Sequence, residues 1–125
     1  DEDTSAPTIE ILKPEENYVV ITGQNLIMKF RFTDEYGIQK YKYEIFSEDM
    51  IGQVGEFTYD KEVFIPQLYT EAVFDHSVKI PETISGTTTP TSTGDYILRV
   101  TATDFYGNTN VLDRTFKIEP NIITE

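Results

Sequence analysis

Two short segments, TDEYG at residues 33–37 and TDFYG at residues 103–107, place an aspartate close to an aromatic residue and a glycine. The carboxylates of Asp34, Glu35 and Asp104 are hard oxygen ligands of the kind that calcium takes, in sets of about six to eight. An aspartate in such a turn also accepts hydrogen bonds from its own backbone amides, while glycine supplies a positive φ. We expect turn formation, with calcium as the weaker alternative, because no EF-hand loop is present.

Aromatic side chains stand next to these acids, with Tyr36 in the first turn and Phe105 and Tyr106 in the second. Aromatic rings can stack on sugars while carboxylates accept hydrogen bonds from sugar hydroxyls, and loops are where binding residues concentrate. The three residues are therefore candidate ligand-binding residues. The alternative is that their rings close one end of the hydrophobic core.

The remaining residues offer little for catalysis. The chain has no Cys and one His, which excludes thiolate chemistry and an ordinary structural zinc site. That residue, His76, alternates in phase with Phe74 and Val78, so we expect it to point inward in a structural role, with Asp75 on the opposite face. No nucleophile-elbow serine accompanies them. We expect no enzymatic activity and no cofactor other than the calcium considered above.

Composition and charge narrow the class of protein. A chain of 125 residues with 38% hydrophobic residues is long and apolar enough to fold as one domain. The 22 acidic against 10 basic residues give a net charge of −12, which repels phosphate backbones and makes nucleic acid an improbable partner. No stretch has the ~20 apolar residues of a membrane span, and the acidic start differs from a signal peptide.

Strict alternation of apolar and polar residues predicts strands at 26–33, 39–46 and 95–104. Weaker strand signals occur at 8–13, 18–21, 57–65, 72–80 and in a last run that ends at Ile118. About seven short strands with no helical period indicate an all-β fold, an immunoglobulin-like antiparallel β-sandwich. The pattern does not predict the path of the strands between residues 47 and 70.

This fold class makes a positional prediction for the two turns. The strands that precede them run in the same direction in an immunoglobulin-like topology, so both turns should lie at one end of the sandwich. The N-terminal residues enter at that end as well. We therefore expect Asp34 and Asp104 to lie close together, near Asp1 and Asp3.

Four segments of the sequence are distinctive: APTIEILKP, FRFTDEYGIQKYKYEI, FDHSVKIP and the closing segment GDYILRVTATDFYGNTNVLDRTFKI. The recurring features of that closing segment are Gly94, Asp95, Tyr96, Asp104, Gly107, Asn108, Phe116 and Ile118. In these segments the sequence resembles a family of uncharacterised immunoglobulin-like domains of Bacteroidetes cell-surface lipoproteins.

The resemblance implies residues 1–7 as a flexible leader after a removed lipoprotein signal, residues 8–119 as the immunoglobulin-like domain and residues 120–125 as a C-terminal tail. It implies a location outside the cytoplasm, at the cell envelope or cell surface, with membrane attachment only through a lipid anchor. A module for cell adhesion or protein interaction is the first functional interpretation. A glycan-binding module that uses the loop aromatics and a passive spacer are the alternatives.

Overall fold

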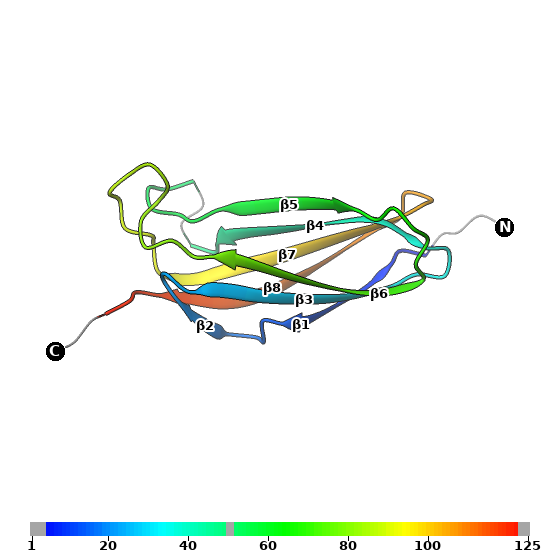
Figure 1. Ribbon diagram of the computed structural model, residues 1–125, viewed down its shortest axis with the longest axis horizontal. Helices are drawn as coiled ribbons and strands as arrows, with labels where there is room; N and C mark the ends of the chain where they lie inside the picture. Colours follow the sequence, from blue (N-terminus) through cyan, green and yellow to red (C-terminus); the bar gives the residue numbers. More distant parts are fainter. Residues whose placement is uncertain (1–4, 50–51, 123–125) are drawn as a thin grey trace.

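The computed structural model describes residues 5–49 and 52–122, in which eight β-strands form two packed sheets (Figure 1). The strands are β1 (Thr8–Lys13), β2 (Tyr18–Ile21), β3 (Asn25–Thr33), β4 (Ile38–Ser47), β5 (Tyr59–Phe64), β6 (Glu71–Lys79), β7 (Gly94–Asp104) and β8 (Thr109–Glu119). One sheet has the order β1-β3-β6 and the other β2-β8-β7-β4-β5. The all-β sandwich prediction is confirmed, with eight strands in place of about seven. No helix in this part of the chain is long and apolar enough to cross a membrane.

The core lies between β3 of one sheet and β4 and β7 of the other. Alternate side chains of a strand point to opposite faces, so each of these strands sends one set of apolar residues inward. The inward set of β3, for example, is Leu26, Met28, Phe30 and Phe32, all fully buried. Each such side chain contributes about 1.5–3 kcal/mol when it is removed from water. The three strands with the clearest alternation are therefore the ones that hold the sandwich together.

The first extended stretch changes sheets at Pro14. Strand β1 pairs antiparallel with β3, whereas β2 pairs in parallel with β8 in the other sheet. Proline has no amide hydrogen to donate to a ladder, which suits the point where pairing stops. The predicted break in an edge strand is thus a crossing from one sheet to the other.

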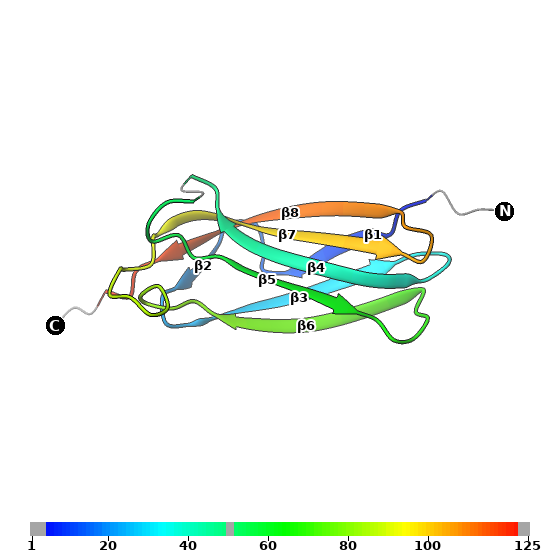
Figure 2. The same ribbon diagram turned by 90° about the horizontal axis from the view of Figure 1, so that it is seen from above.

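From β3 to β7 the chain crosses between the sheets three times. Strand β4 pairs with β5 and β7, while β6 returns to the first sheet and pairs with β3 through nine consecutive residues. Alternation alone allowed the stretches 26–33 and 39–46 to form either a hairpin or a pair of strands in different sheets. The structure shows that they lie in different sheets. This arrangement leaves β5 and β6 as the last strands of their sheets on the same side of the sandwich (Figure 2).

Candidate functional site

The two matching turns lie together at one end of the molecule. Strands β3 and β7 both end there, and Ile38 at the start of β4 pairs with Asp104 at the end of β7 (Figure 2). The rings of Tyr36 and Tyr106 meet edge to face, with centroids 5.6 Å apart. The N-terminal entry is close by, because Thr8 pairs with Thr33. Residues 1 and 3, whose carboxylates were expected nearby, lie outside the described residues.

Each turn aspartate accepts hydrogen bonds from its own turn. Asp34 Oδ2 accepts the backbone N–H of Tyr36 at 3.0 Å. Asp104 Oδ1 accepts the backbone N–H groups of Tyr106 and Asn108, both at 2.9 Å, and its Oδ2 accepts Asn108 Nδ2 at 3.0 Å. Asp104 is fully buried and Asp34 is 7% exposed. The carboxylates therefore act as internal caps of the turns, the role expected of Asp in this sequence context.

The same contacts bear on the calcium hypothesis. Asp34 and Asp104 direct oxygens at backbone amides, and Glu35 is exposed on the first turn. Within residues 5–49 and 52–122 no group of three or more His, Cys, Asp or Glu side chains is arranged to hold a metal ion. Calcium at Asp34, Glu35 and Asp104 stays a prediction.

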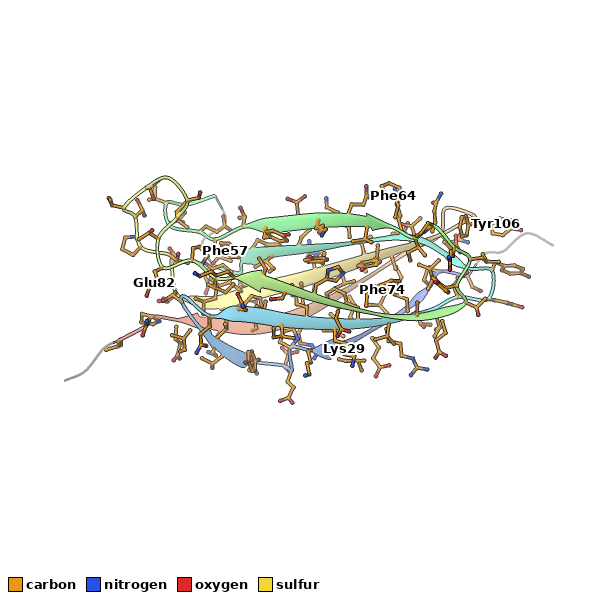
Figure 3. All side chains as sticks on the ribbon, viewed as in Figure 1. Lys29, Phe57, Phe64, Phe74, Glu82 and Tyr106 are labelled. Carbon is orange, nitrogen blue, oxygen red and sulfur yellow. The ribbon has the colours of Figure 1, made fainter. Side chains whose placement is uncertain are left out.

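An exposed apolar surface covers the two turns. Tyr36, Phe105 and Tyr106 are 39%, 48% and 52% exposed, so these rings do not close the core. Leu68, from the loop between β5 and β6, joins them at 67% exposed. We call these four residues the end surface, and Figure 3 labels Tyr106 within it. The fully buried Ile38 forms the core beneath.

Leu68 is the member of the end surface that the sequence did not reveal. Gly37 makes room for it, since a Cβ atom at Gly37 would overlap Leu68 Cδ1 and lie 3.4 Å from Phe105 Cδ2. Gly37 also has φ +104°, a conformation that favours glycine. The loop is held by Ile38, whose N–H donates to the carbonyl of Tyr69 at 3.1 Å. The available signal was an apolar residue in a segment that Pro66 marks as a loop.

His76 has a structural role between the two sheets, on the edge strand β6. Its Nε2 hydrogen bonds with the Tyr41 hydroxyl across the two sheets, and its ring lies 4.7 Å from that of Tyr43 between centroids. Asp75 is exposed on the opposite face of β6, as alternation predicted. A hydrogen bond satisfies the polar atom that β6 carries into the half-buried interior.

We expect His76 to make the fold less stable in mild acid. Burial lowers the pKa of His76, the charge of Lys61 lowers it further, and Asp75 partly opposes both. The unfolded chain therefore binds the proton first as the pH falls below the ordinary value of about 6.5, so stability is full above that pH and is lost below it. Urea unfolding at about pH 7.5 and about pH 5.5 should show a smaller loss for His76→Phe than for the parent. Equal losses would contradict this role.

The strand order, the two unequal and mainly antiparallel sheets and the turn-rich ends define an immunoglobulin-like β-sandwich of the fibronectin(III)-like type. The chain belongs to the family described as a domain of unknown function, DUF4625, whose model matches residues 1–119. A search of the curated proteins found no match.

Solved structures show the same fold at low sequence identity. The fibronectin(III)-like modules of Clostridium thermocellum CbhA give a TM-score of 0.55 at 9% identity, covering 94% of this chain and 100% of that one. Wild-type OgpA from Akkermansia muciniphila gives 0.57 at 8% identity, covering 93% of this chain and 30% of that one. A chitin binding domain from Burkholderia pseudomallei gives 0.45, which is too low to support an inference about this chain.

Proposed function

We propose that this domain is a non-catalytic interaction module that binds a protein partner through the end surface. The observation that carries the proposal is the grouping of four exposed apolar side chains, Tyr36, Leu68, Phe105 and Tyr106, on loops at one end of a rigid sandwich. Exposed apolar patches of this kind mark interaction sites, and aromatic anchors supply most of the binding energy at protein interfaces.

The geometry favours a protein over a glycan. Sugar stacking needs an open aromatic face, whereas Tyr36 and Tyr106 meet edge to face at an interplanar angle of 77°. Leu68 adds an aliphatic side chain, which suits the apolar centre of a protein interface. Glycan binding by the same aromatics and a passive spacer role are the alternatives that the experiment below separates.

We further propose that the module works outside the cytoplasm, in a cell-surface lipoprotein that functions in adhesion. The resemblance to Bacteroidetes lipoprotein domains supports this location, with residues 1–7 as the leader between a lipid anchor and the sandwich. Absence of Cys is compatible with any compartment, so it does not bear on the choice. Protease accessibility of the full-length protein on intact cells tests the location independently of binding.

Serine substitutions at Tyr36, Leu68 and Tyr106 should abolish partner binding. Truncating anchor residues weakens an interface by about tenfold or more each. Beads coated with the domain would be tested for retention on a panel of immobilised extracellular proteins and, in parallel, on a glycan array. The matched control carries serine at three exposed apolar residues away from the end surface, Tyr18, Val54 and Ile122.

Retention on a protein that the triple variant loses and the control keeps supports the proposal. Array binding that the triple variant loses would instead assign the site to a glycan. If the two triple variants are retained equally, the end surface is not the binding site. If the parent is retained on neither surface, the spacer interpretation replaces the proposal.

A further inference from the structure

The five-stranded sheet extends beyond the three-stranded one on the side of β5. Strand β6 lies over β4, since the ring of Phe74 is 4.9 Å from that of Tyr41 and His76 hydrogen bonds with the same tyrosine. Within residues 5–49 and 52–122, no strand of the other sheet lies over β5. The inward residues of β4 are about 1% exposed, whereas Lys61 at an inward position of β5 is exposed.

The result is a half-covered flank along one side of the sandwich. Its inward-facing side chains are apolar or aromatic except for one charge, and most are only partly buried. We call this set the β5–β6 flank, and it consists of Tyr59, Lys61, Val63, Phe74, His76 and Val78. Figure 3 labels Phe74 within it. One more strand beside β6 would cover these residues.

The backbone of β6 is ready to pair with such a strand. At its end, Ile80 donates its N–H to the carbonyl of Gln24 at 2.9 Å, so Ile80 faces β3. Backbone groups of successive residues in a strand point to opposite sides. The N–H and C=O groups of Val73, Asp75 and Ser77 therefore point away from β3, and no strand within the described residues pairs with them.

The other sheet edges carry features that hinder pairing. Strand β5 presents three consecutive charges, Asp60, Lys61 and Glu62, and directs Lys61 inward. Strand β1 has a register irregularity before Pro14, and β2 has only four residues. Charges, bulges, prolines and short length are the means by which edges are protected. Strand β6 has nine residues in unbroken register with β3, with no bulge and no proline. Its three charged residues, Glu71, Asp75 and Lys79, all point outward, and Asp75 alone lies away from the strand ends.

We propose that β6 binds an extended segment of a partner protein, which adds to the sheet as an antiparallel strand and covers the β5–β6 flank. This site is separate from the end surface and is inferred independently of it. Main-chain hydrogen bonds would supply affinity and the inward side chains specificity, as in other cases of strand addition.

Charge defines the chemistry of the segment. Neither Lys61 nor Asp75 forms an ion pair within the described residues, and they lie on opposite faces of the position that the new strand would occupy. In the segment that fits this site, every second residue points inward, and these inward residues are apolar except for one Asp or Glu that meets Lys61. Among the outward residues, one Lys or Arg lies beside Asp75. A second copy of β6 fits less well, because it has no inward acid and two copies of charge −12 repel each other.

A tethered strand tests the proposal directly. The segment Val-Thr-Glu-Lys-Val-Thr-Val would be joined after Glu125 through a flexible Gly/Ser linker, which gives a high effective concentration. Asn121, four residues before the join, lies near the end of β6, because its Nδ2 donates to Glu82 Oε1 at 3.2 Å. Amide hydrogen exchange at Val73, Asp75 and Ser77 should slow by about tenfold or more relative to a fusion that carries a Pro/Gly-rich segment.

Two substitutions sharpen the test. Ser77→Pro removes one edge donor without touching the β3 ladder and should abolish the protection at Val73 and Asp75, whereas Ser77→Ala should keep it. Lys61→Glu should reduce the amide protection given by the Glu-containing segment about two- to fivefold, because like charges then face each other. For a segment with Lys in place of that Glu, the same substitution should increase the protection. The Lys61 result does not depend on whether the proline variant folds.

Unchanged exchange at the three amides in the tethered protein would overturn the proposal. So would protection of equal size with the Pro/Gly-rich segment, because that segment cannot form a strand. If the untethered protein forms a dimer in which these amides are already protected and Ser77→Pro dissolves it, the occupant is a second copy and the partner-segment proposal is wrong. None of these outcomes depends on binding at the end surface.

Discussion

Asp104→Ala should lower the free energy of unfolding by about 3 kcal/mol and the melting temperature by about 10 °C. Asp104 is fully buried and its Oδ1 accepts two backbone N–H groups, those of Tyr106 and Asn108. Alanine removes the buried acceptor of both N–H groups, and each buried unsatisfied group costs about 1–3 kcal/mol. Urea denaturation of parent and variant at neutral pH gives the difference.

The matching turn provides the control. Asp34 Oδ2 accepts the backbone N–H of Tyr36, and Asp34 is 7% exposed, so water can reach this turn more easily and Asp34→Ala should cost about 1 kcal/mol. Asp104→Asn should fall between the two, because its Oδ1 can still accept the backbone amides while its new amide group faces Asn108 Nδ2. Equal costs for the two alanine variants would show that the buried hydrogen bonds of Asp104 do not account for the stability of its turn.

Phe30→Ala should lower the free energy of unfolding by about 3–5 kcal/mol. Phe30 is fully buried at the middle of β3, and its ring lies 5.6 Å from that of Tyr43 and 6.0 Å from that of His76. Removing the ring loses its transfer free energy and leaves a cavity between the sheets that rigid aromatic neighbours cannot fill. The measurement is again urea denaturation, with an unchanged m-value as evidence that the folded state is intact.

Phe64→Ala is the matched control for this substitution. Phe64 lies at the end of edge strand β5, is 64% exposed and has Lys40 Nζ 5.5 Å from its ring centroid. Losing an exposed ring and one surface cation–π contact should cost about 0.5 kcal/mol. A large loss for Phe64→Ala, or a small one for Phe30→Ala, would mean that the core is not centred on β3 and β4.

The end surface and the β6 edge lie on different parts of the same sandwich. The first is a set of loop side chains and the second a row of backbone groups, so a protein that uses both could hold two partners or two parts of one partner. The solved structures share only the fold at 8% and 9% identity, so they do not indicate a ligand for either surface.

The amino-acid sequence determined which residues face the core. Strand geometry has a period of two, so the alternation in 26–33, 39–46 and 95–104 identified inward side chains such as Phe30, Tyr41 and Leu98 before any pairing was known. The turn chemistry of Asp34 and Asp104 was equally local, since an aspartate reaches amides two residues away. The likeness of the two turns, with the strand directions of the fold class, placed them at one end.

Sheet membership was decided only by the tertiary structure. Alternation says which face of a strand is buried but does not say which strand it pairs with, because pairing is between backbone groups that are the same in every residue but proline. Pairing between segments far apart in the chain places β2 beside β8. It also places β5 beyond the edge of the three-stranded sheet and leaves β6 as an unpaired edge strand within the described residues. Leu68 reached the end surface for the same reason, through a loop whose position depends on both sheets.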